Sequence, residues 1–60
     1  MIKVKLVGED GNVFSVIGRV SKALKDAGEK EKATEFVRKA FDSRSYGEVL
    51  CLCEEYVEVK

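Results

Sequence analysis

The sequence contains no histidine and no proline, and its positive and negative charges cancel. Without histidine, the chain lacks the side chain that most often serves as a general base or a metal ligand. With 11 Lys and Arg against 11 Asp and Glu, it has no overall positive field that would attract nucleic acid, so only a local basic patch would do so. The absence of proline leaves the hydrophobic pattern uninterrupted, as expected of a folding chain rather than a disordered one.

Cysteines are few, and long apolar runs are missing. Cys51 and Cys53 lie one residue apart, and on a helix they point about 200° from each other, so they neither pair nor share a metal. A secreted chain this small normally carries several disulfides, and we therefore expect a cytoplasmic protein. No segment approaches the roughly 20 apolar residues of a membrane helix, and MIKVK is not a signal peptide. We expect no membrane partner.

The chain has 60 residues, of which 45% are hydrophobic, and this is enough for one small domain spanning residues 1–60. A domain of this length buries only about 60% of the surface that its unfolded chain exposes, so its stability margin is thin. A second copy would cover apolar surface that one copy leaves exposed, and self-association is therefore a reasonable expectation.

Both ends of the chain show the alternation of β-strands. Residues 2–7, IKVKLV, alternate apolar and basic side chains, and residues 56–60, YVEVK, place Val57 and Val59 inward and Glu58 outward. The charges of Lys3 and Lys5 oppose that of Glu58, which favours pairing between the two strands. Their orientation, parallel or antiparallel, stays open at this point.

Between these ends the apolar spacing becomes helical, with three helices predicted. GEDGN at 8–12 predicts a turn with Asn12 as a helix cap, followed by a helix over 13–27 that Gly28 ends. A second helix follows over 30–42, and Ser45 with Glu48 predicts a capping box that opens a third over 46–55. The inward faces comprise Val13, Ile17, Val20 and Leu24; then Ala33, Phe36, Val37, Ala40 and Phe41; then Val49, Leu52, Cys53 and Tyr56.

We therefore predict an α+β domain with the order β-α-α-α-β, in which three helices pack on one face of a small two-stranded sheet. A two-stranded sheet is only marginally stable alone, and both of its strands are edges. Extension of the sheet across a homodimer would pair those edges.

Gly18 is the most conspicuous residue of the first helix, because glycine weakens a helix interior by about 1 kcal/mol relative to alanine. At about 100° per residue, Gly18 lies at the rim of the apolar face, beside Arg19, Lys22 and Lys25. These residues, Gly18, Arg19, Lys22 and Lys25, form a candidate interaction strip. Either a phosphate or a partner's backbone lies against the strip, or another element of the same chain packs closely against Gly18; the second is the commoner role for such a glycine.

The remaining motifs have simpler explanations than chemistry. GEDGN matches neither the dinucleotide-binding nor the P-loop pattern, and its acidic spacing is not that of a calcium loop. Cys51 has glutamates around it rather than the positive charge that activates a thiol, and the serines have no histidine to activate them. We predict no catalytic, cofactor-binding or metal-binding residues. An aromatic side chain could serve as an exposed anchor, but the sequence does not single one out.

One resemblance covers almost the whole chain. It is carried by VKLVGEDGN at 4–12, Phe14, IGRV at 17–20, KAL at 22–24, Ala27-Gly28 and YVEV at 56–59, and is weakest in the second helix. In these segments the chain resembles a group of short hypothetical proteins encoded by Gram-positive bacteria and their phages. The resemblance implies a small cytosolic protein from a phage or prophage region. It implies no site residues, because the group has no established activity.

These observations favour a small non-enzymatic module that binds a protein partner or a second copy of itself. The alternative is a small nucleic-acid-binding or regulatory protein that uses the basic strip of the first helix. An enzyme is the third class, and no set of residues in the sequence supports it.

Overall fold

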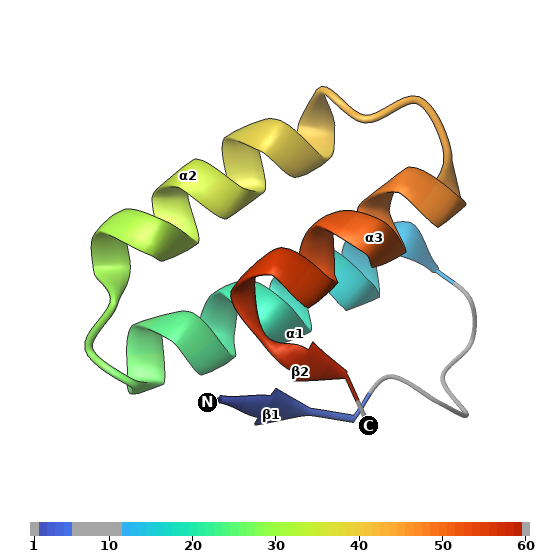
Figure 1. The fold of residues 1–60 in the computed structure, drawn as a ribbon. Coiled ribbons are helices and arrows are strands. Elements are labelled where there is room, and N and C mark those ends of the chain that lie inside the picture. The colour runs from blue at the N-terminus through green and yellow to red at the C-terminus, as the bar shows by residue number, and fades with distance from the viewer. Residues whose placement is uncertain (1, 6–11, 60) are drawn as a thin grey trace.

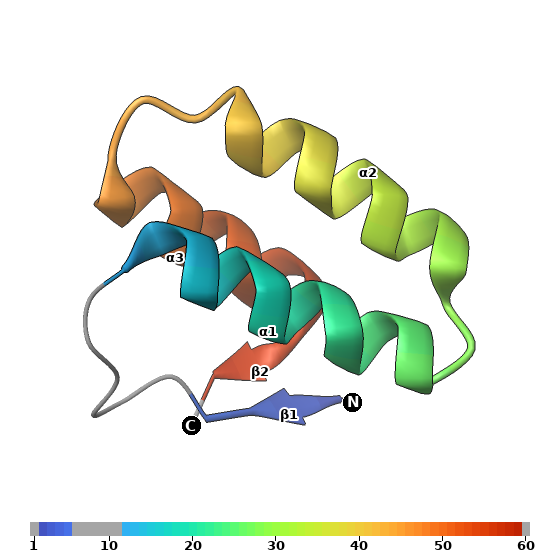
Figure 2. The same cartoon turned by 180° about the vertical axis from the view of Figure 1, so that it is seen from behind.

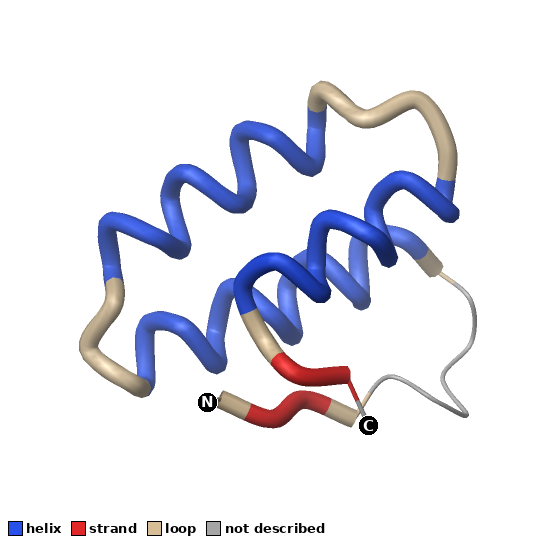
Figure 3. The backbone as a smooth tube through the Cα atoms, in the orientation of Figure 1, coloured by secondary structure: helices blue, strands red, loops and turns tan. Residues whose placement is uncertain are grey.

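The computed structural model describes residues 2–5 and 12–59. Its elements follow the predicted order (Figure 1): β1 (Lys3–Val4), α1 (Val13–Asp26), α2 (Lys30–Phe41), α3 (Tyr46–Tyr56) and β2 (Glu58–Val59). Three helices make up most of the chain, with a two-stranded sheet beside them (Figure 3). Both strands are shorter than predicted. The first leaves out Ile2 and Lys5, and the second leaves out Tyr56, which still belongs to α3, and Val57, which caps that helix. Positions 6–11 of the predicted first strand and turn lie outside the described residues.

Side-chain and backbone caps fix the helix ends where the sequence places them. The Asn12 side chain accepts a hydrogen bond from the backbone N–H of Phe14 at 2.8 Å, and that of Ser45 accepts one from Glu48 N–H at 3.1 Å. After α1 the chain turns at Gly28, whose φ is 82°. Glu29 N–H there donates to the Leu24 carbonyl at 2.9 Å, which completes a Schellman motif.

The two strands pair in parallel, which resolves the orientation that the sequence left open. Lys3 stands opposite Glu58 and Val4 opposite Val59, so the predicted pairing of opposite charges is confirmed for Lys3. Glu58 N–H donates to the Ile2 carbonyl at 2.7 Å. The intervening helices bring the second strand back in the direction of the first.

The helices do not all reach the sheet. α1 and α3 lie on opposite sides of the molecule, with α2 across the top of both and the strands beneath (Figures 1 and 2). Within the described part of the chain, α1 contacts β1 and α3 contacts β2, whereas α2 contacts only the other two helices. The expectation that all three helices pack on the sheet therefore differs from the structure for α2, because a ribbon of two strands is too narrow to support three helices.

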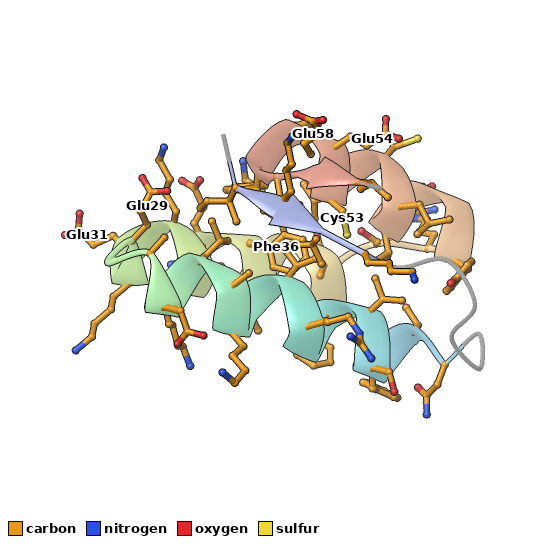
Figure 4. The ribbon with its side chains drawn as sticks, turned by 90° about the horizontal axis from the view of Figure 1, so that it is seen from below. Glu29, Glu31, Phe36, Cys53, Glu54 and Glu58 are labelled. Atoms are coloured by element: carbon orange, nitrogen blue, oxygen red, sulfur yellow. The ribbon has the colours of Figure 1, made fainter. Side chains whose placement is uncertain are left out.

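The core lies between the helices and the ribbon, with Phe36 and Cys53 fully buried within it (Figure 4). Most residues of the predicted inward faces are buried, as the helical spacing indicates. Leu52 and Val37 are only half-buried, at the margin of the core. The buried apolar residues are Val4, Val16, Ile17, Val20, Leu24, Ala33, Phe36, Ala40, Val49, Cys53 and Val57.

Candidate functional site

The candidate strip lies on the outer side of α1, where Gly18, Arg19, Lys22 and Lys25 are all exposed. Apart from its chain neighbours and the backbone of its own helix, no described atom lies within 4 Å of a Cβ built on Gly18. The interpretation that another element of the chain packs closely against this glycine is therefore wrong for α2, α3 and the described residues of the two strands. The physical reason is that Val16, Ile17 and Val20 turn the apolar side of α1 inward and leave Gly18 facing outward.

The strip is basic but not uniformly so. Lys22 Nζ lies 2.9 Å from Asp26 Oδ2, and the two side chains remain 78% and 65% exposed. Such a solvent-exposed i,i+4 pair contributes little to stability and rearranges readily when another charge approaches. The strip therefore presents several cations together with one carboxylate at its end.

A second surface, which the sequence analysis did not locate, is aromatic. Phe14 is 63% exposed, Phe41 62% and Tyr46 40%. Phe41 corrects the prediction that it faces the core. The inward side of α2 is centred on Ala33, Phe36 and Ala40. Phe41 is the last residue of the helix and lies about 100° beyond Ala40 around its axis. Its ring therefore contacts Phe14 instead of the core.

These rings border a hollow of about 440 Å³ between the start of α1, the end of α2 and the start of α3. We call it the aromatic groove, defined by Phe14, Phe41 and Tyr46. The apolar side chains of Ile17, Ala40 and Val49 also line it, and Arg44 is the charged residue among those that line it. The sequence signal for this groove was weak, because each ring lies at a helix end where periodicity no longer decides which side faces inward.

A polar cluster joins α2 to α3 on another side. Tyr56 OH donates to Glu35 Oε1 at 2.5 Å, and Lys39 Nζ lies 5.9 Å from the centre of the Tyr56 ring. The hydrogen bond from Tyr56, followed by the charge of Lys39, lowers the pKa of Glu35. Burial and then the hydrogen bond to Glu35 raise the pKa of Tyr56. Glu35 therefore stays ionised and Tyr56 protonated near neutral pH, and the hydrogen bond between them links α2 to α3.

The two cysteines have the separate positions predicted for them. Cys53 lies in the core, where burial raises its pKa to about 11, and Cys51 is exposed on the outer side of α3. Among residues 2–5 and 12–59, no group of three or more Cys, Asp or Glu side chains is arranged to hold a metal ion.

Comparison of the chain with protein-family models, with curated proteins and with solved structures finds no match. None of the helices within the described ranges is long and apolar enough to cross a membrane. The structure is thus that of a small, mostly helical α+β domain with two conspicuous outer features, the strip on α1 and the aromatic groove.

Proposed function

We propose that this protein is a non-enzymatic interaction module that binds a segment of another protein in the aromatic groove. The observation that carries the proposal is the gathering of three exposed aromatic side chains, Phe14, Phe41 and Tyr46, around one hollow. Large exposed rings that cluster in this way are typical of binding surfaces, because a partner that covers them gains buried apolar area.

The lining of the groove indicates the chemistry of the partner. Its volume of about 440 Å³ accommodates a bulky side chain. Arg44 is the charged residue of the lining. The amino-terminal ends of α1 and α3, where helix dipoles favour negative charge, border the groove together with the carboxyl-terminal end of α2, where the dipole favours positive charge. The occupant that fits is a peptide segment with a large apolar side chain and a neighbouring carboxylate.

A library of short random peptides selected on the immobilised protein tests this function. We expect the enriched peptides to combine a large apolar residue with Asp or Glu, and to bind the wild type with measurable affinity by fluorescence anisotropy. The variant Phe14→Ser with Phe41→Ser should lose that binding by tenfold or more. Because both rings are exposed, circular dichroism should show that the variant remains folded.

The matched control is Ser15→Ala with Thr34→Ala, which changes exposed residues outside the groove. It should bind the selected peptides as the wild type does. Selection that enriches no common pattern, or peptides that bind the Phe14/Phe41 variant equally well, would contradict the proposal.

The alternative function, nucleic-acid binding through Gly18, Arg19, Lys22 and Lys25, has less support. With 11 Lys and Arg against 11 Asp and Glu, the chain has no overall positive field that would attract nucleic acid. This alternative predicts binding to DNA or RNA that weakens steeply with salt and is lost in Lys22→Glu. No binding to either nucleic acid at low salt would dismiss it.

Self-association through the sheet edge stays a prediction. Each strand is two residues long, so an added strand would gain few backbone hydrogen bonds from either edge. Side-chain surfaces therefore offer more to a second copy than the sheet does.

A further inference from the structure

The zero net charge of the chain conceals a separation of charge between two helices. α1 carries the basic residues Arg19, Lys22 and Lys25 with Asp26 as its acidic residue. α3 carries Glu48, Glu54 and Glu55, and no Lys or Arg occurs between Tyr46 and Val59. By contrast, α2 mixes both signs along its length.

α1 and α3 contact each other on their inner sides, and their outer sides face in opposite directions. Figures 1 and 2 show α3 in front of the molecule in one view and α1 in front in the opposite view. Seen from below, Glu54 and Glu58 project from the side of α3 and β2, opposite to α1 (Figure 4). α1 therefore carries an excess of positive charge on its outer side, and α3 carries an excess of negative charge, bordered by Lys39 of α2.

Each charged surface begins, in chain order, with a glycine. On α3 the exposed residues Gly47 and Cys51, one helical turn apart, lie among the glutamates, and we call Gly47, Glu48, Cys51, Glu54 and Glu55 the acidic face. Its own helix backbone and chain neighbours aside, a Cβ built on Gly47 meets one described atom within 4 Å, the Ser45 hydroxyl oxygen at 3.8 Å. Gly18 likewise begins the strip on α1, and among the described residues, its chain neighbours and its own helix backbone aside, nothing lies within 4 Å of a Cβ built on it. Both surfaces therefore allow another backbone to come close.

We infer that the strip on α1 binds the acidic face of α3 in a second copy of this chain. Charge complementarity identifies the occupant, since the same molecule carries both surfaces. Gly18 would lie against the Gly47–Cys51 turn, with Lys22 and Lys25 beside Glu54 and Glu55. A nucleic acid would account for the strip but not for the acidic face. This surface shares no residue with the aromatic groove, so the inference stands apart from the proposed function.

The opposite placement of the two surfaces determines the form of the assembly. A contact between different surfaces leaves one strip and one acidic face unoccupied at the ends of a pair, so further copies add in the same way. Because the charges are exposed, their attraction is weak and decreases as salt shortens the screening length, from about 30 Å at 0.01 M to about 10 Å at 0.1 M. We expect assembly at low salt and high protein concentration that does not stop at a dimer.

Analytical ultracentrifugation of the wild type and of two charge-reversed variants tests the inference. One variant is Lys22→Glu with Lys25→Glu, and the other is Glu54→Lys with Glu55→Lys. The average mass of the wild type should rise steadily with concentration at low salt and fall to that of the monomer at high salt. Each variant alone should stay monomeric, and an equimolar mixture of the two should assemble again.

A matched control separates the loss of this contact from general repulsion between copies that carry a net negative charge. Lys30→Glu with Arg38→Glu changes the net charge as the α1 variant does, but on α2. Alone, it should assemble as the wild type does, because both of its surfaces are intact. Gly18→Leu changes no charge, and it should assemble less than the wild type because the new side chain holds the helices apart.

Several outcomes would overturn the inference. A wild type that is monomeric at every concentration at low salt would do so, as would an α2 control that loses assembly as fully as the α1 variant. A mass that levels off at a dimer would indicate a symmetric contact instead. Binding of duplex DNA that depends on Lys22 and Lys25, without self-assembly, would assign the strip to nucleic acid. Phe14→Ser with Phe41→Ser should leave assembly unchanged, which keeps this test distinct from that of the groove.

Discussion

The rings of Phe14 and Phe41 lie with their centroids 5.8 Å apart and their planes tilted by 41°, although one belongs to the first turn of α1 and the other ends α2. Aromatic pairs in such tilted arrangements attract each other by about 0.5–1.5 kcal/mol beyond the area they bury. The pair therefore joins two helix ends while leaving most of each ring in solvent. Among the phenylalanines of α2, Phe36 holds the core and Phe41 does not.

Replacing Phe36 and Phe41 one at a time distinguishes the contribution of core packing from that of the surface ring pair. Phe36 is 0% exposed, so Phe36→Ala should lower the free energy of unfolding by about 3–5 kcal/mol, which is close to the whole stability of a domain this small. Phe41→Ala should cost about 1 kcal/mol, the attraction of the ring pair. Urea unfolding followed by circular dichroism measures both, and equal losses would show that the core is not where the structure has it.

Replacing Gly18, within α1, and Gly28, just after its carboxyl end, should change the stability of the protein in opposite directions. Gly18→Ala should stabilise the protein by about 0.5–1 kcal/mol, since alanine favours the helix and the added methyl group meets open space. Gly28→Ala should destabilise it by about 1–2 kcal/mol, because φ there is 82°. Thermal unfolding reports both changes, and a loss of stability in Gly18→Ala would mean that the helix packs against something at this point.

The hydrogen bond between Tyr56 and Glu35 should be visible as a shift in acidity. The pKa of Glu35 is lowered by Tyr56 and then by Lys39, so NMR titration of its side-chain carboxyl carbon should show a midpoint below that of an ordinary glutamate. Because the pKa in the folded state is the lower one, the contribution to stability is present above the unfolded pKa and lost as pH falls through the folded value. Tyr56→Phe should move the midpoint back towards the ordinary value, and an unchanged midpoint would show that the bond does not form in solution.

The two thiols should differ in reactivity and in their effect on alkaline stability. At neutral pH, Ellman's reagent should modify Cys51 in the folded protein and reach Cys53 only on unfolding, so that Cys51→Ser abolishes the reaction of the folded state. Burial raises the pKa of Cys53 to about 11, compared with about 8.5 in an unfolded chain. Stability is therefore full below the unfolded pKa and declines as pH rises through the interval between the two values. Rapid modification of both thiols in the folded protein would place Cys53 outside the core.

Local signals in the sequence predicted the elements well, because each depends on residues close together in the chain. Asn12, Ser45 and Gly28 mark helix ends through their own side chains or their lack of one, and the structure shows them in these roles. The alternation of charge on the terminal strands likewise predicted that Lys3 and Glu58 oppose each other.

The features of the structure that the sequence did not predict depend on residues far apart in the chain. The parallel direction of the strands follows from how the helices stack, and the position of α2 on the other helices follows from the narrowness of the ribbon. Phe41 lies at a helix end, where a small change in direction decides between core and solvent. The aromatic groove forms where three helix ends meet, so no single stretch of the sequence predicts it.

The pairing of Lys3 with Glu58 also bears on the order of folding. It joins positions near the two extremes of the chain, so it closes a larger loop than any contact between neighbouring helices and carries the higher entropic cost. The helical hairpins form through shorter loops and can gather before the ribbon closes. The ribbon is then the last part to assemble and the first to open, and its amide protons should exchange with solvent faster than those at the centre of α1.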